Sequence, residues 1–108
     1  MQEFHALTNA QRLLSLLRAP LAELRTKDPK LADEARRASR SIVANTAEGS
    51  GRLGRDRRHF FSIALGSARE LDAHLRIAVG EELLAADAMS EPLAVLDREK
   101  GLLWGLTH

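Results

Sequence analysis

Apolar residues recur at helical spacing in four long segments of the chain. The first segment has its apolar positions at Ala10, Leu13, Leu14, Leu17, Leu21 and Leu24. Intervals of three and four residues place these side chains on one face of an α-helix. Thr8 and Gln11 have the spacing of a capping box, which predicts that this helix begins near Thr8. Pro20 lacks a backbone N–H and is expected to kink or break it.

The second helix has a clear predicted start and end. Asp28 is suited to the N-cap and Pro29 to the first helical position. Gly49 and Gly51 follow the apolar positions and predict that the helix ends between residues 48 and 52. The apolar stripe of this helix consists of Leu31, Ala35, Ala38 and Ile42.

Two further helices complete the pattern. The third is predicted to begin near Gly54 or Arg55 and to end near Gly80. Gly66 lies inside it at a cost of roughly 1 kcal/mol relative to alanine, which predicts the close approach of a neighbouring helix. Residues 81–89 are expected to form a loop or a frayed turn. The fourth helix is predicted from Ser90, with inner positions at Leu93, Leu96, Leu103 and Leu106.

Composition supports an all-α fold with an aliphatic core. The chain has 19 Leu and 17 Ala but only three Val, three Ile and 4% aromatic residues. Four amphipathic helices with short connections predict one domain, residues 1–108, folded as an antiparallel up-down four-helix bundle. The absence of cysteine excludes disulfides and thiolate metal sites. No signal peptide or membrane span is recognised, so a cytoplasmic location is expected.

Positive charge is concentrated in the middle of the chain. Residues 35–60 contain seven arginines against two acidic residues, although the whole chain has a net charge of +1. Such a cluster can neutralise the phosphates of RNA or DNA, or it can be an ordinary charged helix start. Cations are mildly unfavourable at a helix N-terminus, which favours a functional reason. The candidate nucleic-acid contacts are Arg36, Arg40, Arg52, Arg55, Arg57 and Arg58.

A second stripe on the second helix is polar. Spacings of three and four residues place Arg37, Ser41, Asn45, Glu48 and Arg52 on one face. Ser67, Glu70 and His74 form a shorter stripe on the third helix. Because small polar residues are frequent here, we expect partly buried hydrogen bonds rather than a plain solvated face. Glu48 or Glu70 is expected to pair with an arginine of a neighbouring helix or subunit.

The sequence contains only weak signals for nucleotide binding, metal binding or catalysis. Gly49, Gly51 and Gly54 spell G-x-G-x-x-G, but the motif follows a predicted helix rather than a strand, so a turn between helices is favoured over a nucleotide site. Glu70 and His74 have a spacing suited to metal ligation, but the paired Glu-x-x-His motifs of di-iron bundles are absent. No nucleophile with a base can be assembled. The sequence therefore predicts no enzyme activity, cofactor or metal.

The segment of residues 36–52, RRASRSIVANTAEGSGR, resembles the signature of a family of small four-helix bundles. Its members include proteins encoded in intervening sequences of 23S ribosomal RNA genes, which were once taken for a ribosomal protein and are called S23-like. Accessory proteins of diversity-generating retroelements are related. Residues 60–67, FFSIALGS, with Glu70, Leu71 and Leu75, resemble a second block. Thr46, Pro20 and the lack of Phe-Pro before the second helix depart from the usual pattern.

The resemblance implies a homo-oligomer of five subunits and, from the retroelement relatives, binding to nucleic acid or a nucleoprotein. The residues expected to form an oligomeric or structural polar network are Arg37, Ser41, Asn45, Glu48, Gly49, Gly66, Ser67 and Glu70. Our first hypothesis is therefore a pentameric adapter that contacts RNA or DNA through its Arg-rich region. The alternative is a scaffold made of protein alone, without a nucleic-acid ligand.

Overall fold

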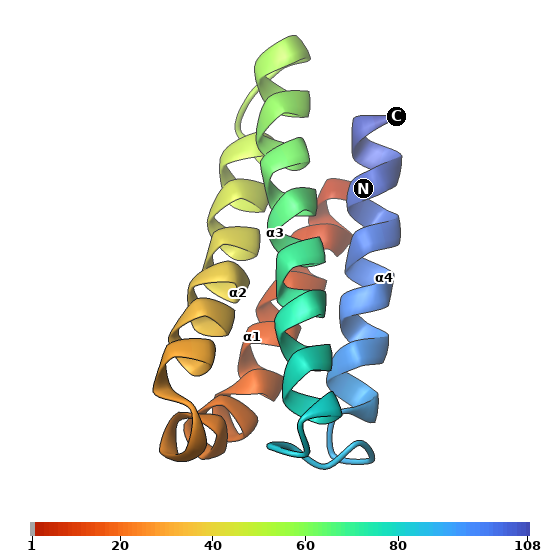
Figure 1. The fold of residues 1–108 in the computed structure, drawn as a ribbon. Helices are drawn as coiled ribbons and strands as arrows, with labels where there is room; N and C mark the ends of the chain where they lie inside the picture. The colour runs from red at the N-terminus through yellow and green to blue at the C-terminus, as the bar shows by residue number, and fades with distance from the viewer. Residues whose placement is uncertain (1) are drawn as a thin grey trace.

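Four antiparallel helices account for nearly all of the structure, a computed structural model that describes residues 2–108 (Figure 1). They are α1 (Gln2–Lys27), α2 (Pro29–Ser50), α3 (Gly54–Gly80) and α4 (Ser90–Thr107). Helices that follow one another in the chain pack together, and α1 closes the arrangement against α4. The predicted four-helix bundle is confirmed, and its extents of 42 × 22 × 19 Å make it an elongated rod.

Local sequence signals account for the boundaries of α2 and α3. Asp28 accepts a hydrogen bond of 3.1 Å from the backbone N–H of Leu31, and Pro29 occupies the first turn. The backbone N–H of Gly51 donates to the carbonyl of Glu48 at 3.2 Å and closes the helix. Gly54 opens α3 with φ at +60°, a conformation that glycine adopts without strain. The predictions for both boundaries are confirmed.

Helix α1 begins earlier than the sequence predicts. The prediction of a start near Thr8 is wrong, because the helix already includes Gln2 and leaves Thr8 exposed. Ala6 is fully buried and extends the apolar stripe by a turn. The Gln2 side chain donates a hydrogen bond of 2.8 Å to the carbonyl of Leu102. Contact with α4 therefore adds a turn that the capping pattern does not reveal.

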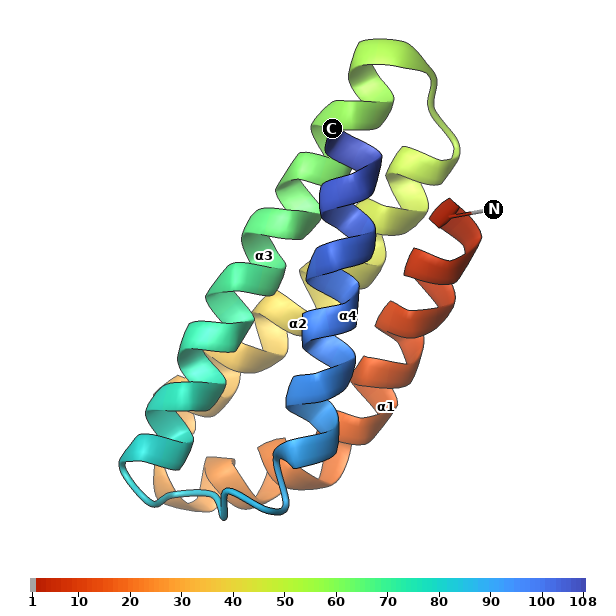
Figure 2. The same ribbon diagram turned by 90° about the vertical axis from the view of Figure 1, so that its right-hand side faces the viewer.

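Pro20 lies inside α1 without ending it. Figure 2 shows that the last turns of α1 run at an angle to the rest of the helix, crossing beneath the bundle. The predicted effect of Pro20 is thus a change of direction in a continuous helix, as expected where one hydrogen bond of the helix is missing.

Leucine and alanine dominate the core, as composition predicts. Fully buried leucines come from α1, α3 and α4, and fully buried Ile42 joins them from α2. Phe61 is the large aromatic side chain buried among them, whereas Phe4 and Trp104 are exposed. The predicted loop at residues 81–89 is confirmed, and buried Leu84 and Met89 attach it to the core.

Within residues 2–108, no helix combines the length and the apolar character needed to cross a membrane. The cytoplasmic location stays a prediction.

Candidate nucleic-acid interface and subunit face

The turn between α2 and α3 is built on a close contact between a glycine and a phenylalanine. Gly49 is buried, and a Cβ at this position would lie 2.8 Å from Cε1 of Phe61. Gly51 and Gly54 flank a short link between two helices. The glycine motif is therefore a helix–helix turn, and Gly49 serves packing within the subunit.

Two of the predicted nucleic-acid contacts are engaged within the chain. Arg52 donates to Glu48 at 2.6 Å, lies 3.8 Å from Asp56 and covers the ring of Phe60 at 5.1 Å. The hydrogen bond that Arg52 donates to Glu48 and the negative charge of Glu48 raise the pKa of Arg52 above its usual value. The expected pairing of Glu48 with another helix is wrong within the subunit, because its partner lies one turn away on the same stretch of chain.

Arg57 is engaged in a similar way. Its guanidinium lies 3.2 Å from the carboxylate of Glu3 and 4.9 Å from the ring centre of Phe61. This side chain therefore ties the start of α3 to the first turn of α1. Its charge is partly compensated, which makes Arg57 a weaker candidate for contacts with phosphate.

Arg55 and Arg58 differ from these two arginines. Both are exposed, and neither has an ion pair with any residue in the described range 2–108. The N-cap residue of α3, Leu53, provides no side-chain hydrogen bond and is 87% exposed. We call residues 52–58 the α3 tip. It combines free arginines with an uncapped helix N-terminus.

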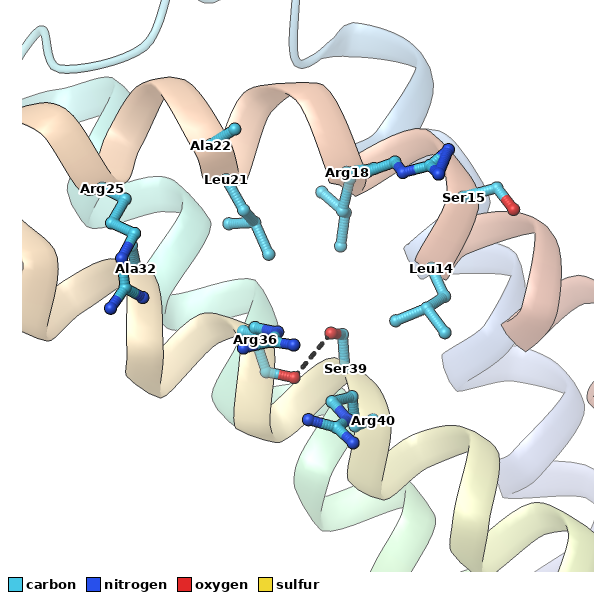
Figure 3. Close-up of a pocket in the computed structure, with 11 residues that line it drawn as sticks. Leu14, Ser15, Arg18, Leu21, Ala22, Arg25, Ala32, Arg36, Ser39 and Arg40 are labelled. Carbon is cyan, nitrogen blue, oxygen red and sulfur yellow. Dashed lines mark hydrogen bonds between the residues drawn. The ribbon is translucent and has the colours of Figure 1, made fainter.

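Arg36 and Arg40 lie away from the α3 tip, on a different surface. Arg40 is ten residues before the end of α2 at Ser50, about 15 Å along the helix. Both side chains line an open groove of about 770 Å³ between α1 and α2, which we call the basic groove. Figure 3 shows Leu14 and Leu21 directed from α1 towards this gap, with Arg36 and Arg40 on the α2 side. The structure thus divides the six predicted arginines between two surfaces.

The predicted polar stripe joins α2 to α3. The hydroxyls of Ser41 and Ser67 share a hydrogen bond of 2.7 Å across the two helices. The Asn45 amide donates to the carbonyl and to the hydroxyl of Ser41, both at 3.0 Å. These three residues are half-buried, so the expectation of partly buried hydrogen bonds is confirmed for them.

Charged members of the stripe remain at the surface. Arg37, Glu48 and Glu70 are exposed, and Glu70 has His74 at 3.4 Å rather than an arginine. Arg37, Ser41, Ser67 and Glu70 line a groove of about 540 Å³. We call the surface formed by Ser41, Asn45, Ile63, Gly66, Ser67, Glu70 and Ile77 the α2–α3 face.

Gly66 has no close neighbour among residues 2–108 of its own subunit. It is exposed, and a Cβ at this position would meet nothing within 4 Å. The predicted close approach of a neighbouring helix is therefore not found within the described residues of the subunit. Ile63 and Ile77, 38% and 44% exposed, lie on the same face of α3 at helical spacing from Gly66.

Sequence reasoning missed the most deeply buried charged residue. Glu99 of α4 is 0% exposed, and its Oε1 accepts a hydrogen bond of 3.0 Å from Asn9 of α1. The amide of Asn9 also donates to the carbonyl of Val95, whereas Oε2 of Glu99 has no partner among the described residues. We call Asn9, Val95 and Glu99 the α1–α4 seam.

The protonation of Glu99 reflects this environment. Burial raises its pKa from 4.5 to about 7, and the hydrogen bond from Asn9 and the charge of Arg98 oppose this rise. The sequence holds a signal for the pair, because both residues occupy apolar positions of their helices. Glu99 lies between Leu96 and Leu103, and Asn9 between Ala6 and Leu13.

The described part of the chain offers little support for a metal site. Residues 2–108 contain no cluster of three or more His, Asp or Glu side chains arranged to hold a metal ion. His74 is half-buried, and its Nε2 lies 3.7 Å from Glu34 of α2 and 3.4 Å from Glu70 of α3, so its contacts join the two helices.

Comparison with known proteins identifies the family to which this chain belongs. No curated protein matches the chain. The fold is similar to the 1.70 Å crystal structure of a protein of unknown function from the S23 ribosomal protein family of Bacteroides thetaiotaomicron. The TM-score is 0.90 at 17% sequence identity, over 99% of this chain and 98% of that one. The family model for 23S rRNA-intervening sequence proteins matches residues 6–105. The chain therefore belongs to the family of 23S rRNA-intervening sequence proteins.

Proposed function

We propose that the protein is a non-enzymatic, homo-oligomeric adapter that binds RNA or DNA through the α3 tip. The observation behind this proposal is the pair of exposed arginines, Arg55 and Arg58, which lack an acidic partner among residues 2–108. Cations in the first turn of a helix are disfavoured by the helix dipole. An anionic ligand would offset that cost, because it attracts both the arginines and the free backbone N–H groups.

Phosphate is the anion that fits the tip best. Aromatic rings in this region are already covered, since Arg52 lies over Phe60 and Arg57 over Phe61. Stacking of bases on these rings is therefore less favourable than contact with the phosphate backbone. Binding of this kind has little sequence specificity and depends strongly on salt.

The α2–α3 face supports the homo-oligomeric part of the proposal. It combines two exposed isoleucines with exposed Gly66, and a Cβ at that glycine would meet no atom within 4 Å among the described residues. Close packing of a second copy against α3 would bury these apolar side chains and use the space beside Gly66. Five subunits are the number that the family resemblance implies.

Titration of fluorescent duplex RNA and DNA at several salt concentrations tests the nucleic-acid contact. The Arg55→Ala/Arg58→Ala double variant should weaken binding whatever the sequence, and should reduce the salt slope by about 1 for each arginine removed. Arg76→Ala is the matched control, because Arg76 is an exposed arginine of α3 held by Asp72 at 3.0 Å. Equal effects of both changes, or binding that does not respond to salt, would reject the proposal.

A scaffold without nucleic acid is the second candidate, favoured by the engagement of Arg52 and Arg57 within the chain. In that case Arg37, which lines the groove of the α2–α3 face, would serve contacts between subunits. Arg37→Glu should then lower the oligomer mass measured by light scattering after nuclease treatment. An unchanged mass together with salt-sensitive RNA binding would favour the adapter.

A further inference from the structure

The basic groove between α1 and α2 has an apolar floor and a rim of arginines. Leu14, Leu17 and Leu21 of α1 form most of the floor. Leu17 and Leu21 are 0% and 9% exposed, so half-exposed Leu14 and exposed Ala22 supply most of the apolar surface that is open to a ligand. Arg18 and Arg25 rise on the α1 side, and Arg36 and Arg40 on the α2 side. The lining of the groove includes no acidic residue.

Three of the four rim arginines have no ion-pair partner among residues 2–108. Arg25 forms an ion pair with Asp33. Arg18, Arg36 and Arg40 have no side-chain hydrogen bond or ion pair with any residue in the described part of the chain. Positive charges gathered without partners around an apolar surface favour a ligand that is both apolar and acidic.

The dimensions of the groove suit a short helix. Leu14 and Arg25 are eleven residues apart, a path of roughly 16 Å or three helical turns along α1, which changes direction at Pro20 within this stretch. An amphipathic helix lying in such a groove would place apolar side chains at i, i+3 or i+4, and i+7 on the leucine floor. Carboxylates flanking that stripe would reach the arginines on the two walls.

We propose that the basic groove binds an acidic amphipathic helix of a protein partner. Nucleic acid fits less well, because a phosphate backbone would leave the apolar surface of Leu14 and Ala22 uncovered and the groove lining holds no aromatic residue for stacking. A second copy of this chain also fits less well. Its acidic segment at residues 81–89 is a loop whose Leu84 is buried in its own core.

A synthetic helical peptide of three to four turns tests the proposal, with Leu on one face and Glu beside it. We expect it to bind the full chain and to shift the NMR signals of residues 14–25 and 32–40. A peptide with Lys in place of Glu should not bind. The Arg36→Glu/Arg40→Glu double variant should weaken binding at least tenfold, since like charges then face each other. Arg76→Glu, on α3, should leave it unchanged.

Four results would overturn the proposal. The first is no binding of the acidic peptide, and the second is a set of NMR shifts outside the groove. The third is a fall in oligomer mass for Leu14→Asn, a half-exposed floor position, which would assign the groove to a second copy. Duplex RNA that shifts the groove signals where the peptide does not would also reject it. The nucleic-acid proposal is tested separately at Arg55 and Arg58.

Discussion

Uncharged polar side chains take part in contacts between helices at the α1–α4 seam and at the α2–α3 face, and water reaches the two regions unequally. At the α1–α4 seam, Asn9 and Glu99 are 7% and 0% exposed, and one carboxylate oxygen has no partner within residues 2–108. At the α2–α3 face, Ser41, Asn45 and Ser67 are half-buried and satisfy one another. Burying the first pair lowers the free energy of unfolding, because an ionised carboxylate in the core lacks solvation. The second costs little and leaves polar groups at a surface that another molecule can contact.

This difference indicates what each region does. A carboxyl that is buried with a single neutral donor weakens the fold when it ionises, so the α1–α4 seam makes stability depend on pH. Half-buried hydroxyls contribute little to stability, and their arrangement beside an open groove favours a role in association. Substitutions at Glu99, Gly66 and Ser67 test this contrast, and a substitution at Gly49 provides a reference for crowding of the core.

The largest effect is expected at Glu99. Because its pKa is raised to about 7 in the folded state, the stability of the wild type falls as pH rises from 4.5 towards 7 and stays low above that range. At about pH 8.5, Glu99→Gln should therefore be more stable by about 3 kcal/mol. This gain should shrink as pH falls towards 4.5. Urea unfolding at several pH values measures it.

Asp97→Asn is the control for this prediction, because its side chain is 84% exposed and lies two residues away on α4. It should change stability by much less at every pH. A gain for Glu99→Gln that does not vary with pH would show that the carboxyl is not buried in the manner described.

Gly49→Ala should cause the next largest change. The added methyl group would lie 2.8 Å from the buried ring of Phe61, and crowding of a packed core costs about 1–3 kcal/mol. Thermal unfolding should show a lower midpoint. Gly51→Ala is the comparison, since a Cβ there meets its nearest atom at 3.7 Å. Equal midpoints for the two variants would contradict the packing role of Gly49.

Gly66→Ala should have opposite effects on the subunit and on its assembly. Nothing in the subunit lies within 4 Å of the added methyl group, so helix propensity should increase stability by up to about 1 kcal/mol. If a second copy packs closely on the α2–α3 face, the same methyl group should reduce oligomer mass in analytical ultracentrifugation. A stabilised protein with unchanged mass would place the interface elsewhere.

The smallest effect is expected for Ser67→Ala. It removes the hydrogen bond of 2.7 Å to Ser41, but both hydroxyls are half-buried and water can replace the partner. The free energy of unfolding should fall by less than about 1 kcal/mol. Chemical denaturation checks this value, and a loss as large as that of Gly49→Ala would mean that the α2–α3 face is as dry as the α1–α4 seam.

The intervals between apolar residues were sufficient to predict the helices, because helix periodicity and capping act over a few residues. Asp28, Pro29 and Gly54 marked boundaries for the same local reason. The start of α1 escaped this reasoning, since Gln2 is held by a carbonyl 100 residues away. Gly66 escaped it as well, because an exposed glycine and a tightly packed one have the same sequence signal.

The sequence by itself determined the bundle, its aliphatic core and the concentration of arginines near α2 and α3. Only the tertiary structure decided that Asn9 faces Glu99, that Arg52 and Arg57 are engaged within the chain, and that Arg36 and Arg40 border a different surface from Arg55 and Arg58. The physical reason is that periodicity fixes which face of each helix is apolar. The pairing of polar side chains depends on how the helices align along their axes, which distant contacts determine.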